Sequence, residues 1–148
     1  GDTARAREQA TIAFNVRPLN EEYADLLAEA MYAADEREAL VDFLQRQVAE
    51  RGRVSDYIRL GRFSKRLGNA DEALVAFNTA ARVDAGRTVA PHLALAEFYE
   101  QIGDQRQQVQ RLRMALFIEP DNLRIQEQLR ALGEVVGPSL PLRPTELP

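Results

Sequence analysis

The amino-acid sequence predicts an all-α protein made of helix-turn-helix units, and three observations lead to this prediction. Residues with high helix propensity, above all alanine, leucine, arginine, glutamate and glutamine, are abundant throughout. Apolar and small residues recur at three- and four-residue spacing between short breaks that contain glycine or proline. Residues 54–86 and 89–122 also superimpose, each with two helical patterns, which indicates an internal repeat.

The composition excludes several classes of function. The chain has 148 residues with a net charge of −4, whereas a dedicated nucleic-acid binder usually carries a basic excess. Cysteine is absent and His92 is the single histidine, so we predict no thiol catalysis, metal site or cofactor. No apolar run approaches the roughly 20 residues of a membrane span, so we expect no membrane insertion by this chain.

Arginine provides all the basic residues except Lys65. This bias is typical of a GC-rich coding genome and makes a bacterial source the expectation. Selection of arginine for planar, bidentate pairing with carboxylates is the other interpretation.

Residues 1–20 predict a helix over Ala4–Val16 that forms the second half of a truncated repeat. The chain begins without a methionine or a signal-peptide pattern, so we expect an excerpt from a longer protein. Its compartment is therefore unknown, since a cysteine-free chain suits the cytoplasm and the periplasm equally. If Ile12 and Phe14 lack a partner helix, self-association through this end remains open.

Residues 21–53 predict a complete unit, although its turn at 33–36 lacks glycine. Its first helix would bury Leu27, Ala28 and Met31, and its second would bury either Leu40 or Ala39.

The units at 54–88 and 89–122 carry the clearest pattern. The small residues Gly61, Ala73 and Ala80 would let two helices approach closely, with large residues such as Phe77 filling the space between them. Gly68 and Gly103 follow the first helix of each unit, where a left-handed cap is expected. The second unit is bounded by two prolines: Pro91 suits the first turn of a helix, and Pro120 ends one. Asp71 and Asp104 stand where a carboxylate favours the start of the next helix.

Residues 123–135 predict a capping helix, and residues 136–148 form a proline-rich tail that cannot be helical. Three roles for the tail remain open. It could be a linker, it could pack over the last helix through its leucines, or it could dock in the groove of a neighbouring molecule. The leucines concerned are Leu140, Leu142 and Leu147.

This pattern resembles the tetratricopeptide repeat, a helix-turn-helix unit of about 34 residues. The residues that match are Tyr57, Leu60, Gly61, Gly68, Ala73, Phe77 and Ala80 in one unit, and Leu95, Ala96, Tyr99, Gly103, Asp104, Leu112, Ala115 and Pro120 in the next. The resemblance implies that residues 1–135 form one repeat domain, a right-handed superhelical solenoid. It also implies a concave groove, lined by the first helix of each unit, that receives a peptide or a helix of a partner protein.

The groove positions are acidic, then basic, then acidic along the stack. The candidate partner-binding residues are Asp25, Glu29 and Tyr32, then Arg59, Arg62 and Arg66, then Glu97 and Glu100. In one interpretation Arg62 pairs with Glu29 and with Glu97, and such a ladder stiffens the stack. In the other, the arginines recognise an acidic segment or a terminal carboxylate. The family's carboxylate clamp of lysine and asparagine is not matched.

We therefore expect a non-catalytic interaction module of a larger protein, with a protein or peptide as its partner. The alternative is a helical appendage of an enzyme such as a glycosyltransferase or a polysaccharide-assembly or export protein. His92 is expected to be a packing residue, because it falls where the repeats place an aromatic ring. Arg111 and Arg113 are expected to be solvated on the convex side.

Overall fold

The computed structural model describes residues 1–148 as eight α-helices without a β-strand, which confirms the all-α class. The helices are α1 (Asp2–Val16), α2 (Glu21–Ala33), α3 (Arg37–Glu50), α4 (Val54–Arg66), α5 (Ala70–Asp84), α6 (Ala90–Ile102), α7 (Gln105–Ile118) and α8 (Leu123–Ala131). None of them combines the length and the low polarity needed to cross a bilayer.

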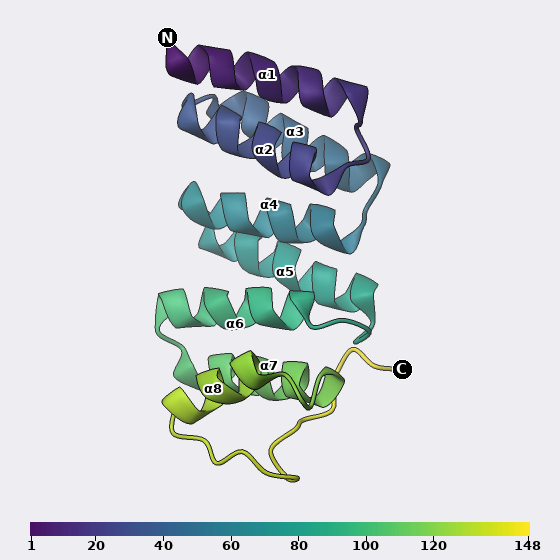
Figure 1. Ribbon diagram of the computed structural model, residues 1–148, viewed down its shortest axis with the longest axis vertical. Coiled ribbons are helices and arrows are strands. Elements are labelled where there is room, and N and C mark those ends of the chain that lie inside the picture. Colours follow the sequence, from purple (N-terminus) through teal and green to yellow (C-terminus); the bar gives the residue numbers. More distant parts are fainter.

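The helices are stacked along the long axis in chain order, with α1 at one end and α8 and the tail at the other (Figure 1). Each helix contacts the one before it and the one after it, and α4 also touches α6. The contacts are most extensive between α4 and α5 and between α6 and α7. Because α2, α4 and α6 all contribute to one cavity, they share one face of the stack.

The core is divided into three clusters that follow one another along the stack. In the first cluster Leu40 is fully buried and Ala39 is exposed, which decides between the two candidates. Phe14 packs edge-on against Phe43, with ring centroids 5.2 Å apart, so Phe14 has a packing partner within the chain. Ile12 is 51% exposed.

The connections follow the turn residues. Gly68 and Gly103 have φ angles of 90° and 78°, which confirms the left-handed caps. Asp104 caps α7 by accepting a hydrogen bond from the backbone N–H of Gln107. In the glycine-free turn between α2 and α3, Asp35 takes the left-handed conformation at φ 56°, which a short polar side chain tolerates.

The Phe77 side chain of α5 lies directly against the backbone of Gly61 on α4. A Cβ atom at this position would lie 2.6 Å from Cε1 of the Phe77 ring, well inside van der Waals contact. The absence of a side chain therefore lets α5 lie against α4 with Phe77 buried between them.

The tail packs mainly against α7, and Leu140 also joins the apolar cluster that contains Ile125 and Leu129 of α8, the helix over which packing was predicted. Arg113 donates from Nε to the carbonyl oxygen of Leu140 at 2.7 Å, and Leu142 donates its N–H to the carbonyl oxygen of Arg113. Arg111 pairs with Glu146 at 2.6 Å. The expectation that both arginines are merely solvated was wrong, because the tail brings acceptors to them.

His92 lies beneath this contact and is 1% exposed, so its predicted packing role is confirmed. Its Nδ1 atom is 3.3 Å from Nη1 of Arg111, and its Nε2 atom is buried without a partner. Burial lowers the pKa of His92; Arg111 acts in the same direction, while Glu146 and Asp84 oppose it. The folded protein therefore holds this imidazole neutral more strongly than the unfolded chain does.

We predict that changing Gly61 to Ala destabilises the protein by about 1–3 kcal/mol, as overpacking does. This cost exceeds the gain of about 1 kcal/mol expected from replacing a helical glycine. Urea unfolding of the variant and of the unchanged protein measures the net change in the free energy of unfolding. Introducing Gly61→Ala into a Phe77→Leu background should cost less, and an equal cost in both backgrounds would contradict the steric explanation.

We predict that stability falls as the pH drops below 6.5, the ordinary pKa of histidine, because the unfolded chain then binds a proton that folded His92 resists. The slope from one such group is at most about 1.4 kcal/mol per pH unit. Urea unfolding at several pH values between about 7.5 and 5.5 measures it. The variant His92→Gln should lose this part of the slope of unfolding free energy against pH. An unchanged slope would mean that other titratable groups cause it.

Candidate functional site

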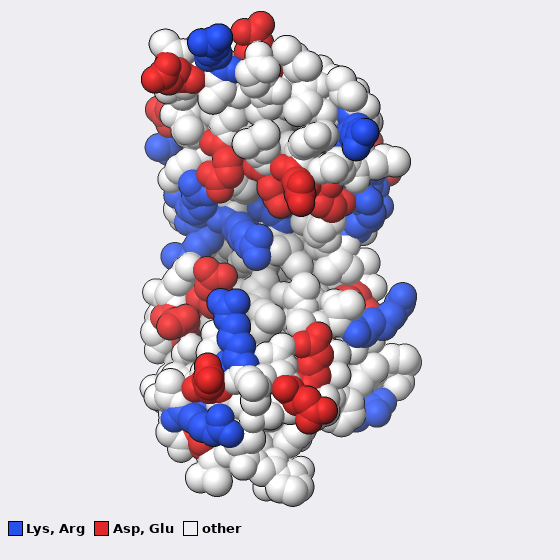
Figure 2. Space-filling view, viewed as in Figure 1, with Lys and Arg blue, Asp and Glu red and all other residues white.

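The face shared by α2, α4 and α6 contains a cavity of about 350 Å³. Its lining comprises Asp25 and Glu29 from α2, Arg59, Arg62, Phe63, Lys65 and Arg66 from α4, Phe77 from α5, and Ala94, Glu97, Phe98 and Gln101 from α6. In the space-filling view an acidic band lies above a basic band on this face (Figure 2). Six of the eight predicted site residues therefore line one cavity.

The other two predicted residues lie beside this cavity. Tyr32 has the guanidinium carbon of Arg66 3.9 Å above its ring centroid. Glu100 lines a neighbouring cavity of about 460 Å³ between α6 and α8, to which Glu97 also contributes.

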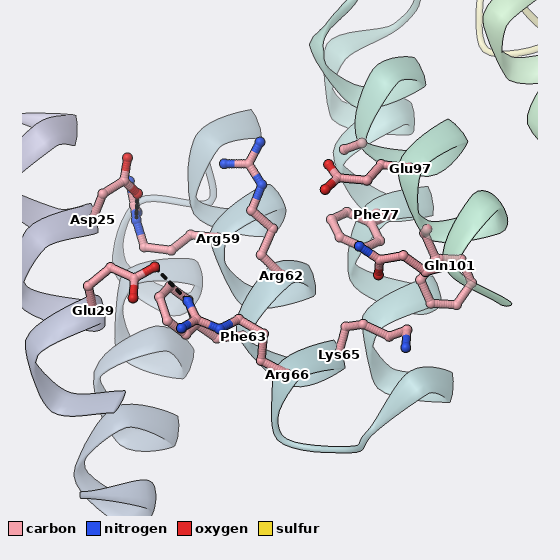
Figure 3. A pocket seen from close by; sticks show the side chains of 12 residues that line it. Asp25, Glu29, Arg59, Arg62, Phe63, Lys65, Arg66, Phe77, Glu97 and Gln101 are labelled. Carbon is pink, nitrogen blue, oxygen red and sulfur yellow. Dashed lines mark hydrogen bonds and ion pairs between the residues drawn. The ribbon is translucent and has the colours of Figure 1, made fainter. Parts of the chain in front are cut away.

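Helical spacing brings the lining residues together. Asp25 and Glu29 are four residues apart on α2, and Glu97 and Gln101 are four apart on α6, so each pair shares one helix face. The basic residues of α4 lie between these two pairs (Figure 3). The predicted order of acidic, basic and acidic helices is thus present on this face.

Arg59 is buried between α2 and α4 and is only 3% exposed. Its guanidinium donates to Asp25 at 2.6 Å and to Glu21 at 2.7 Å, and it also contacts Asp56 at 3.2 Å. Burial alone would lower the pKa of Arg59, but the hydrogen bonds and charges of Glu21 and Asp25 raise it above its ordinary value. Arg59 was predicted as a partner-binding residue of the groove, but its guanidinium is engaged by three carboxylates, which make its burial tolerable.

Asp56 is the centre of this ion cluster, and sequence reasoning missed it. Its side chain is fully buried and accepts from the guanidinium of Arg51 at 2.8 Å and from the backbone N–H of Arg53 at 3.1 Å. The second bond is half of a capping box at the start of α4, and an acidic residue three positions after the cap is its sequence signal. Arg51 also donates to the carbonyl oxygen of Pro18, so the cluster joins α4 to the α1–α2 connection.

Arg66 is held by an ion pair with Glu29 at 2.5 Å. Its guanidinium also lies over the rings of Tyr32 and Phe63, which is a cation–π arrangement. The predicted pair between Arg62 and Glu29 was therefore wrong, because Glu29 is engaged by the arginine that stacks on Tyr32.

Arg62 and Lys65 make no ion pair in the structure, and neither does Glu97, so the predicted pair between Arg62 and Glu97 is also not formed. Arg62 and Glu97 are exposed, and Lys65 is half-buried. Neither pair of the predicted ladder forms: α2 and α4 are joined by Arg59 and Arg66 instead, and no ion pair joins α4 to α6. Two cations remain available at the cavity, and an available guanidinium or ammonium can bind an anionic group through charge-assisted hydrogen bonds.

No group of three or more histidine, cysteine or carboxylate side chains is placed to hold a metal ion. Comparisons of the sequence with protein-family models and with curated proteins found no match.

We predict that Arg59→Ala lowers the free energy of unfolding by about 3–5 kcal/mol, the range for breaking a buried ion pair, because Asp56 loses a buried counter-charge. Arg62→Ala, on the same helix but without an ion pair, should change it by no more than about 0.5 kcal/mol. Urea unfolding of both variants measures the difference. Equal effects of the two substitutions would contradict the division of the α4 arginines into ion-paired (committed) and unpaired (available) side chains.

Proposed function

We propose that this chain is a non-catalytic scaffold of the tetratricopeptide type, a right-handed superhelical solenoid that binds a segment of a partner protein on the α2, α4 and α6 face. The single observation that carries the proposal is the cavity on this face, where Arg62 and Lys65 are unpaired above an aromatic floor. Four of the twelve lining residues are apolar and the other eight are polar or charged, so the cavity favours recognition through charge-assisted hydrogen bonds beside a small aromatic floor.

The stacking of consecutive helices supports the repeat part of the proposal. Helices that contact mainly their chain neighbours are typical of repeat proteins, in which each unit buries its apolar face against the next. The close approach at Gly61, with the Phe77 ring against it, lies at two of the positions that carry the family resemblance.

The two carboxylates with an altered pKa lie outside the cavity lining and are held by arginines. The carboxylate of Glu21 has a lowered pKa, because hydrogen bonds and charges from Arg59 and Arg53 outweigh the effect of burial, and it is therefore held as an anion by arginines. The other acidic group with an altered pKa, Glu146, is tied to Arg111 under the tail. Neither is free to exchange a proton with a ligand in the cavity.

We predict that a photo-reactive amino acid at Gln101, which is exposed and lines the cavity, forms discrete adducts with a partner in a lysate of the source organism. The same group at Arg106, an exposed position on α7, is the control. The Gln101 adducts should disappear when Arg62 and Lys65 are both changed to Glu. Adducts that form equally from Arg106, or that survive the charge reversal, would count against binding at this face.

A further inference from the structure

The ionisable groups around the cavity are not equally available to a ligand. The buried ion cluster balances three arginines, Arg51, Arg53 and Arg59, against Glu21, Asp25 and Asp56. The pair of Arg66 with Glu29 is also balanced. Among the lining residues, Arg62, Lys65 and Glu97 are left, so two positive charges and one negative charge face the cavity without a partner.

The floor of the cavity is apolar and already formed. Phe63, Phe77 and Phe98 line it, and each ring is fixed by packing, with 3–4% of its surface exposed. The rings of Phe77 and Phe98 meet edge-on with centroids 5.9 Å apart. A floor that does not have to rearrange costs little conformational entropy on binding.

We propose that this cavity recognises a short segment of a partner protein in which a single carboxylate stands next to an aliphatic or aromatic side chain. This inference rests on the proposed function and specifies its partner. The carboxylate would pair with Arg62 or Lys65, whose side chains leave α4 in different directions (Figure 3), and the apolar side chain would lie on the floor at Phe77 and Phe98. Charge complementarity selects the acidic group, and burial on the aromatic floor provides the anchor.

The surrounding charges limit the ligand to one carboxylate. Asp25 and Glu29 border the cavity on the α2 side, and Glu97 borders it on the α6 side, with Glu100 beyond it (Figure 3). Asp25 and Glu29 are already paired with Arg59 and Arg66, whereas Glu97 and Glu100 have no cationic partner. A run of acidic residues or a nucleic-acid backbone would place further negative charges against Glu97 and Glu100, and like charges held close together are unfavourable. The site therefore selects an isolated acidic residue and disfavours a polyanion.

The experiment is selection of a random peptide library, displayed on phage, by the folded chain. Enriched peptides should carry one Asp or Glu adjacent to a large apolar residue. A synthetic peptide of the enriched sequence should bind the double variant Arg62→Glu and Lys65→Glu about 10–100-fold more weakly, which fluorescence anisotropy measures. Glu97→Gln should bind it several-fold more tightly, because the competing carboxylate is removed.

The matched control is Arg82→Glu combined with Arg106→Glu, two exposed arginines outside the cavity, which should leave the affinity unchanged. Circular dichroism of each variant establishes that it is folded. The control could lose as much affinity as the double variant Arg62→Glu and Lys65→Glu. Net charge, and not this site, would then attract the peptide, and the inference would be overturned.

The remaining outcomes separate this inference from the proposed function. The enriched peptides could cross-link to a probe at Gln101 and yet lack a carboxylate or consist of acidic runs. Either result would overturn the inference and leave binding in the groove in place. If no peptide is enriched and the Gln101 probe yields no adduct with a partner, both the inference and the proposed function fail.

Discussion

Burial of the Arg59 guanidinium between α2 and α4 requires neutralisation, since an unpaired charge in that position would be strongly unfavourable. Glu21 and Asp25 on α2 and Asp56 on α4 provide it. Asp56 also binds Arg51, and Arg51 donates a hydrogen bond to the α1–α2 connection at Pro18. One ion cluster therefore links the end of α3, the start of α4 and the α1–α2 connection. The cluster holds α2 against α4 on the face that carries the cavity.

The cluster also determines which charges are left for binding. The sequence does not distinguish the basic residues of α4 from one another. In the structure, carboxylates of α2 pair with Arg59 and Arg66, whereas Arg62 and Lys65 have no such partner. The face is asymmetric, because ion pairs join α4 to α2 and none joins α4 to α6. One carboxylate would offset the local excess of positive charge at the cavity, where Arg62 and Lys65 face only Glu97, without displacing any existing pair.

Local features were predictable from the sequence because they depend on neighbouring residues. The turns at Gly68 and Gly103, the cap at Asp104 and the shared face of the groove residues all follow from local conformation and helical spacing. The partners of the arginines were not predictable, because pairing between helices depends on side-chain length and on stacking over Tyr32. The packing position of the tail was also not predictable from the sequence. Its proline content excludes a helix but does not indicate which residues Leu140 contacts.

The central claim is that the arginines of α4 are divided into committed and available side chains. Hydrogen exchange of the arginine Nε–H groups, followed by nuclear magnetic resonance, tests it directly, because a buried donor exchanges slowly and a solvated one does not. We expect the Nε–H of Arg59, which donates to Asp25 at 2.6 Å, to be protected, and that of Arg62 to exchange at the rate of a solvated side chain. Equal exchange rates for the two groups would contradict the account.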